Sequence, residues 1–137
     1  MKTLAKWKRA WRTAIAPNLT ARGLEALRVA LVNDDRRLIQ GRAALPGPGR
    51  PDAVCEAGCA VAFAFWIGHG LRTVGEVEFY VWTVRGADVN KVTDFMNWFD
   101  VTKRDVMRRE LLVELERVLN RRRLASTSPR RPVALAV

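Results

Sequence analysis

Two cysteines and a single histidine are the residues of this sequence best suited to bind a metal or act as nucleophiles. Cys55, Cys59 and His69 could supply three ligands of a zinc ion, with an Asp or Glu as the fourth. Zinc sites usually use two closely spaced cysteine pairs, whereas this chain has one Cys-x3-Cys pair in an apolar segment. Apolar surroundings also raise the pKa of a thiol. We therefore expect two buried, reduced, metal-free cysteines and no Cys–His nucleophile.

Acidic residues in the central third of the chain offer a second kind of chemistry. Paired carboxylates can hold a metal ion for phosphodiester hydrolysis, and the candidates are Glu76, Glu78, Asp88, Asp94 and Asp100. Asp94 and Asp100 flank the aromatic stretch 95–99. Glu76 and Asp88, however, stand at positions typical of helix caps, and Asp100 at a position typical of a turn. A metal-dependent nuclease-like enzyme is therefore the third of the functions considered.

Other catalytic classes lack their residues. The only serines are Ser126 and Ser128, close to the end of the sequence, whereas a serine hydrolase needs an oriented, buried serine beside a base. No glycine-rich loop followed by Lys-Ser or Lys-Thr is present, so no P-loop is visible. The sequence favours a non-enzymatic protein without a cofactor.

The charge of the chain is concentrated in its two ends. The net charge of the 137 residues is +10, with +8 in residues 1–50, −4 in residues 51–101 and +6 in residues 102–137. The acidic middle segment also holds nine of the eleven aromatic residues. This pattern predicts an aromatic core between two basic flanks that attract anionic partners.

Residues 1–16 have the periodicity of a basic amphipathic helix that Pro17 ends. Trp7 and Trp11 lie on its apolar stripe, and its cations are Lys2, Lys6, Lys8, Arg9 and Arg12. Two interpretations of the tryptophans are open. They could bind outside the domain, on an anionic membrane or in a groove of a partner, or they could pack on the core of their own domain.

Five further helices follow from periodicity and capping residues. A helix starts after Thr20 and closes near Gly41, with a break or an exposed turn at residues 33–35. Residues 53–67, capped by Asp52, form a small-residue helix that is apolar nearly all round and therefore central. It would place Cys55 and Cys59 on one face. Residues 77–84 suit either helix or strand, and the capping box of Thr73 and Glu76 favours helix.

The last two helices begin at caps as well. Asp88 caps a helix over residues 89–99, and Thr102 with Asp105 resembles a capping box that opens a long final helix. Its end carries Arg121, Arg122 and Arg123, where cations complement the helix dipole.

These elements predict an all-α protein: a single compact helical domain of five to six helices. Its parts are a basic N-terminal helix (1–17), a helical domain (18–124) with its main loop at 45–52, and a flexible basic tail (125–137). No apolar run is long enough to span a membrane, and Lys and Arg interrupt residues 1–17, so we expect no secretory signal and a reducing cytoplasm.

Two stretches resemble an uncharacterised family of small helical bacterial and phage proteins. They are Val54-Cys55-Glu56-Ala57-Gly58-Cys59-Ala60 and Asn97-Trp98-Phe99-Asp100-Val101-Thr102, the latter followed by a leucine-rich helix. The resemblance covers residues 20–120. It implies a helical fold and transfers no site residues, because that family has no assigned activity.

The leading functional hypothesis is a small basic binding module that contacts the phosphates of RNA or DNA without reading sequence. Its contact residues would be Lys2, Lys6, Lys8, Arg9, Arg12, Arg121, Arg122, Arg123, Arg130 and Arg131. The alternative is a protein-interaction or assembly subunit, in a phage or host-defence complex, that docks on an acidic protein surface through Trp7 and Trp11. The sequence leaves the oligomeric state open.

Overall fold

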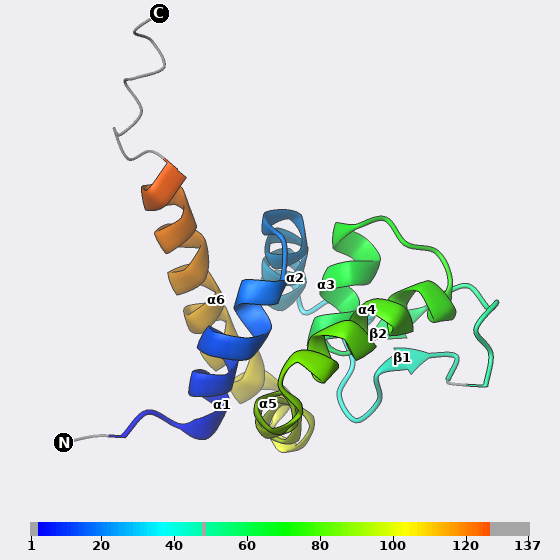
Figure 1. Cartoon of the computed structure of the whole chain (residues 1–137), viewed down its shortest axis with the longest axis horizontal. Coiled ribbons are helices and arrows are strands. Elements are labelled where there is room, and N and C mark those ends of the chain that lie inside the picture. Colours follow the sequence, from blue (N-terminus) through cyan, green and yellow to red (C-terminus); the bar gives the residue numbers. More distant parts are fainter. Residues whose placement is uncertain (1–2, 48, 127–137) are drawn as a thin grey trace, which may run out of the picture.

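The computed structural model describes residues 3–47 and 49–126, and within them the fold is all-α with one short two-stranded antiparallel sheet (Figure 1). The α2 helix packs against both α3 and α6, and α1 packs along α5. None of the helices in these ranges has the length and apolar character needed to cross a membrane. In chain order the elements are α1 (Lys6–Ala10), η1 (Trp11–Ile15), η2 (Ala16–Asn18), α2 (Ala21–Asn33), β1 (Ala44–Leu45), β2 (Ala57–Gly58), α3 (Ala60–Gly68), α4 (Val74–Ala87), α5 (Val89–Val101) and α6 (Arg104–Ser126).

The N-terminal helical segment starts later than predicted and changes its winding twice. Residues 3–5 are not helical, α1 passes into a π-helical turn, and Pro17 lies in the final 3₁₀ turn. Its apolar stripe is buried as a block: Trp7, Ala10, Trp11, Ala14 and Ile15.

The second helix has the predicted start but ends early. The Thr20 hydroxyl accepts the hydrogen bond of the Gly23 amide at 3.0 Å, which confirms the N-cap. The helix stops at Asn33 because Asp34 adopts a left-handed conformation, with φ of 52°. The extension to Gly41 is therefore wrong, and residues 33–35 are a break in the helix.

The predicted helix over residues 53–67 is half wrong. Residues 53–59 are not helical, and β2 pairs with β1 in the register Ala44 to Gly58 and Leu45 to Ala57. The Gly58 amide donates to the Arg37 carbonyl at 2.8 Å, and the Gly58 carbonyl accepts from Ile39 at 2.9 Å. These bonds join segments that are distant in sequence. The helical periodicity of residues 53–67 cannot reveal them. Cys55 and Cys59 consequently do not share a helix face.

The remaining part of that prediction is confirmed, because α3 is a central helix whose residues 60–65 are all buried. Its small residues allow a very close approach to α2. A Cβ atom added at Gly68 would lie 2.5 Å from the Cα atom of Gly23, closer than a side chain tolerates. Glycine at this crossing therefore sets the distance between the two backbones.

Residues 77–84 are helical, and both halves of the capping box are present. The Thr73 hydroxyl accepts from the Glu76 amide at 3.2 Å, and the Glu76 carboxylate accepts from the Thr73 amide at 2.9 Å. Asp88 accepts from the Lys91 amide at 3.1 Å and caps α5 as predicted.

Thr102 does not cap α6. It is the C-cap residue of α5, where its hydroxyl donates to the Trp98 carbonyl at 2.6 Å, and α6 begins two residues later. The first half of α6 packs an apolar face on the core, since Met107, Leu111 and Leu115 are fully buried. The helix runs to Ser126 and so includes the first two residues of the predicted tail. Residues 127–137 lie outside the described residues.

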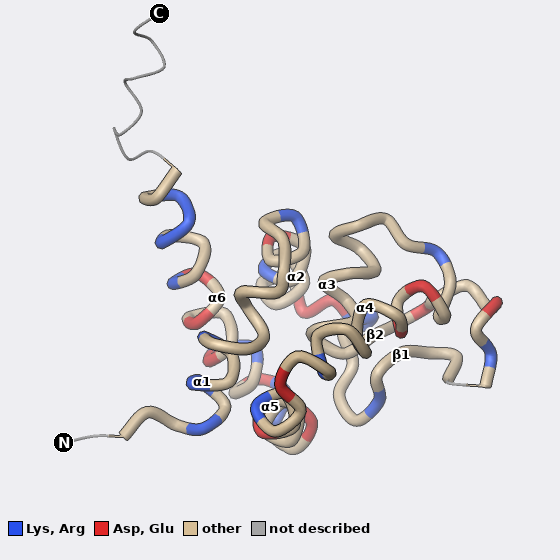
Figure 2. The backbone as a smooth tube through the Cα atoms, in the orientation of Figure 1, with Lys and Arg blue, Asp and Glu red and all other residues tan. Residues whose placement is uncertain are grey.

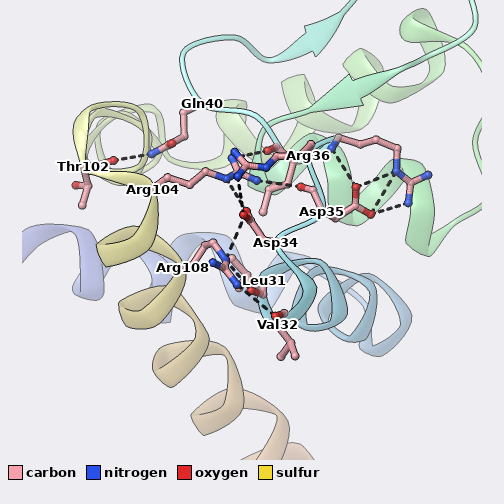
Figure 3. A network of polar contacts seen from close by, with 11 residues as sticks. Leu31, Val32, Asp34, Asp35, Arg36, Gln40, Thr102, Arg104 and Arg108 are labelled. Atoms are coloured by element: carbon pink, nitrogen blue, oxygen red, sulfur yellow. Dashed lines mark hydrogen bonds and ion pairs between the residues drawn. The ribbon is translucent and has the colours of Figure 1, made fainter.

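Two arginines from α6 close the C-terminal end of α2, where helical carbonyl groups have no partner within the helix. Arg104 donates to the Leu38 carbonyl at 2.8 Å, to the Asp35 carbonyl at 2.9 Å and to the Asp34 carboxylate at 2.7 Å. Arg108 donates to the Leu31 carbonyl at 2.9 Å and the Val32 carbonyl at 3.2 Å (Figure 3). Cations at this end also complement the helix dipole.

Replacing Arg104 should therefore destabilise the fold. We expect Arg104→Gln to lower the free energy of unfolding by about 1.5–3 kcal/mol, because charge-assisted hydrogen bonds to two backbone carbonyls and a carboxylate are lost. Arg109→Gln removes an exposed arginine of the same helix and should change stability by less than about 0.5 kcal/mol. Urea denaturation followed by circular dichroism measures both, and equal effects of the two substitutions would contradict the assignment.

Candidate nucleic-acid interface

The two basic flanks of the sequence meet in the structure on neighbouring helical segments. Arg12 in η1 and Glu114 in α6 are 102 residues apart, yet they form a bidentate ion pair in which Nε lies 2.8 Å from Oε1 and the terminal nitrogen 2.8 Å from Oε2. Farther along, Arg122 donates to the Ala16 carbonyl at 2.9 Å. These contacts fasten the N-terminal segment to the middle and to the C-terminal end of α6.

Glu114 is the single acidic residue whose side chain is buried in the described part of the chain, at 3% exposure. The hydrogen bonds from Arg12 lower the pKa of this carboxyl below its ordinary value, against the effect of burial, which alone would raise it. The positive charges of Arg12, Lys8 and Arg117 act in the same direction. One carboxylate is thus within electrostatic reach of cations from both flanks.

The outer cations of these segments remain available to a ligand. Lys6, Arg9 and Arg121 are exposed, and Lys8 and Arg117 are half-buried. Between residues 117 and 126, α6 carries four arginines and no acidic residue, and residues 3–18 carry no acidic residue either. Figure 2 shows Lys and Arg on α1 and on the last turns of α6, with Asp and Glu also present on the turns of α6 between them. The interface proposed below consists of Lys6, Lys8, Arg9, Arg117 and Arg121, and is called the α1–α6 basic surface.

Several residues that were predicted to contact nucleic acid make contacts within the protein or lie outside the described residues. Arg12 is held in the ion pair with Glu114, and Arg122 is held by the Ala16 carbonyl. Arg123 is exposed and donates to the Asn120 side chain at 3.1 Å. Lys2, Arg130 and Arg131 lie outside the described residues. Arg117 was not predicted, although its spacing of four residues from Arg121 places both on one helix face.

The tryptophans of the N-terminal segment pack on their own domain. Trp7 is 7% exposed and stacks on Trp98 of α5, with 3.6 Å between ring centroids and an angle of 4° between planes. Trp11 is fully buried, 5.7 Å from the ring of Phe95. Of the two interpretations of the tryptophans, packing on the core of their own domain is the one that the structure has. A partner could use these rings only if the segment left the domain.

The cysteines and the histidine do not gather into one site. Both thiols are buried, and burial raises the pKa of Cys59 to about 11, which leaves it almost entirely protonated at neutral pH. His69 packs against both Phe65 and Tyr80, and its Nε2 atom is 3.3 Å from the Thr20 hydroxyl. Within residues 3–47 and 49–126, no three Cys, His, Asp or Glu side chains lie close enough to hold a metal ion.

Three of the five predicted acidic residues make contacts that stabilise the fold. Glu76 and Asp88 are helix caps, and Asp100 accepts the hydrogen bond of the Gly41 amide at 2.8 Å.

Beside Asp100 lies a hollow of about 240 Å³ between α4, α5 and residues 41–43. Its lining includes the apolar residues Val61, Val81 and Val92 as well as Cys59, Arg42 and Arg85. Known small-molecule sites are larger, from about 300 Å³ upwards.

Comparisons with protein-family models, curated proteins and solved structures gave no match for this chain. Its function must therefore be argued from its own residues and their arrangement.

The Arg12–Glu114 pair makes a prediction about pH. Glu114→Gln should lower the free energy of unfolding by about 2–4 kcal/mol at neutral pH, because it leaves the Arg12 charge without its partner. The folded-state pKa of Glu114 lies below the unfolded-state value near 4.5. The pair therefore stabilises the fold fully above that pH, and this stabilisation is lost as the pH falls through the folded-state pKa.

The measurement is denaturant unfolding of the wild type and Glu114→Gln between neutral pH and pH 3. The difference in stability should shrink below about pH 4.5. Glu116→Gln, at an exposed position of α6, should differ from the wild type by less than about 0.5 kcal/mol at neutral pH. A Glu114→Gln difference that stays constant over the whole range would contradict the linkage.

Proposed function

We propose that this protein binds nucleic acid through the α1–α6 basic surface and contacts phosphates without reading base sequence. The observation that carries the proposal is the joining of two basic flanks, about 100 residues apart in sequence, by the Arg12–Glu114 pair. Bringing cations together costs electrostatic repulsion. Cations that are held close together and still face outward therefore support binding of an anionic ligand. Lys6, Arg9 and Arg121 do so.

The composition of the surface supports phosphate contacts rather than base readout. Its residues are Lys and Arg, the side chains that neutralise phosphates and release counterions. The aromatic rings of α1 and η1 are buried, so this surface presents no exposed ring on which a base could stack. Ligands of this type bind without sequence preference, and their affinity falls steeply as salt rises.

The test is a comparison of two triple variants with the same net charge. The first replaces cations of the α1–α6 basic surface and is Lys6→Gln, Arg9→Gln and Arg121→Gln. The second is Arg42→Gln, Arg50→Gln and Arg72→Gln, which removes three exposed cations elsewhere on the molecule. Because both lose three positive charges, any difference between them reports the location of binding and not the total charge.

We expect the surface variant to bind a short single-stranded or duplex oligonucleotide more weakly and with a flatter salt dependence. Each lost phosphate contact should reduce the slope of log K against log salt by about 0.7–0.9, so three contacts reduce it by about 2–3. The control variant should keep a slope close to that of the wild type. Fluorescence anisotropy across a salt series measures the slopes. Equal losses in the two variants, or wild-type binding by the surface variant, would refute the proposal.

A further inference from the structure

Two aromatic side chains stand outside the packing that covers the others. Phe79 is 67% exposed and Trp82 is 65% exposed, whereas the other nine aromatic residues, all within the described ranges, are buried or half-buried. The two lie three residues apart on α4 and therefore on one face of that helix. Thr83 and Gly86, also exposed, continue the same face. Paired exposed aromatics of this kind mark an interaction surface.

The charges along α4 change sign from one end to the other. Glu76 and Glu78 lie in its first half and Arg85 in its last turn, where the Arg85 guanidinium carbon is 5.6 Å from the Trp82 ring centroid. The helix is net acidic, so a phosphate backbone laid along it would meet two carboxylates. An antiparallel copy of the same helix would meet the opposite charge at each end.

We propose that α4 is the contact surface of a two-fold symmetric dimer of this chain. With the axis passing near the midpoint between Phe79 and Trp82, antiparallel packing gathers the four rings around the axis. The same register brings Glu78 of one copy close to Arg85 of the second copy, twice by symmetry. Glu78 is half-buried and Arg85 is exposed, so both side chains can turn to this contact.

The small area of this contact limits its strength. An aromatic side chain buries about 150–250 Å² when fully covered, and with about two thirds of each ring open, four rings supply roughly 400–700 Å². A stable interface buries about 1,200–2,000 Å² in total. The dimer is therefore weak, with a dissociation constant between about 1 µM and 1 mM.

The primary experiment is analytical ultracentrifugation of nuclease-treated protein over a concentration series. At about 1 M salt the Debye length is about 3 Å, so bridging by residual nucleic acid is suppressed while contact between rings remains. The full chain should pass from monomer to dimer as its concentration rises. Trp82→Ala should weaken the dimer at least about tenfold, as central aromatic residues of interfaces do. Val113→Ala, which truncates an exposed apolar residue of α6, should leave it unchanged.

A charge exchange tests the register. At about 0.15 M salt, Glu78→Arg and Arg85→Glu should each weaken the dimer, because each places like charges opposite one another. The double variant restores opposite charges in both copies and should recover association. Monomer at every concentration up to about 1 mM, or no recovery in the double variant, would overturn the proposal. A Trp82→Ala variant that loses oligonucleotide binding but keeps the dimerisation of the wild type would also overturn it, because the exposed face of α4 would then be a base-stacking surface.

Discussion

The structure depends on the bidentate contact between Arg12 and Glu114. It joins η1 to α6 across 102 residues of sequence, and Glu114 is nearly inaccessible to water. Two segments that both carry an excess of positive charge repel one another unless a counter-charge lies between them. Glu114 supplies that charge, and Lys8 and Arg117 lower the pKa of its carboxyl together with Arg12. A single buried carboxylate therefore allows the basic flanks to pack side by side.

The arginines divide into those that hold the fold and those that face outward. Arg12, Arg104, Arg108 and Arg122 each reach a distant element, and the last three bind backbone carbonyls there. Arg9, Arg121, Arg42 and Arg50 are exposed. Composition treats all of these side chains as equal contributors to the net charge of +10. The distinction decides which substitutions should change stability and which should change only binding.

Local signals in the sequence were sufficient for the elements that are stabilised locally. The caps at Thr20, Thr73 and Asp88 and the apolar stripe of residues 7–15 depend on neighbours within a few turns, and each was predicted. Thr102 is a local failure, because its hydroxyl bonds to the Trp98 carbonyl and not to the start of α6, and the other failures involve long-range contacts. The pairing of Gly58 with residues 37–39 replaced the start of a helix, and Arg104 and Arg108 stabilise an early end of α2 that periodicity alone does not reveal. For the same reason the sequence indicated two separate basic ends. It did not predict that they lie side by side, or that Arg117 belongs to the α1–α6 basic surface.

The central claim is that the two ends form one nucleic-acid surface, and NMR titration tests it most directly. Amide chemical shifts of the isotope-labelled full chain are followed while a short oligonucleotide is added at low salt. We expect α1 and the last turns of α6 to shift together, with one common saturation curve, while the two loops that contain Arg50 and Arg72 stay unchanged. Shifts confined to one of the two ends, or centred on α4, would contradict it.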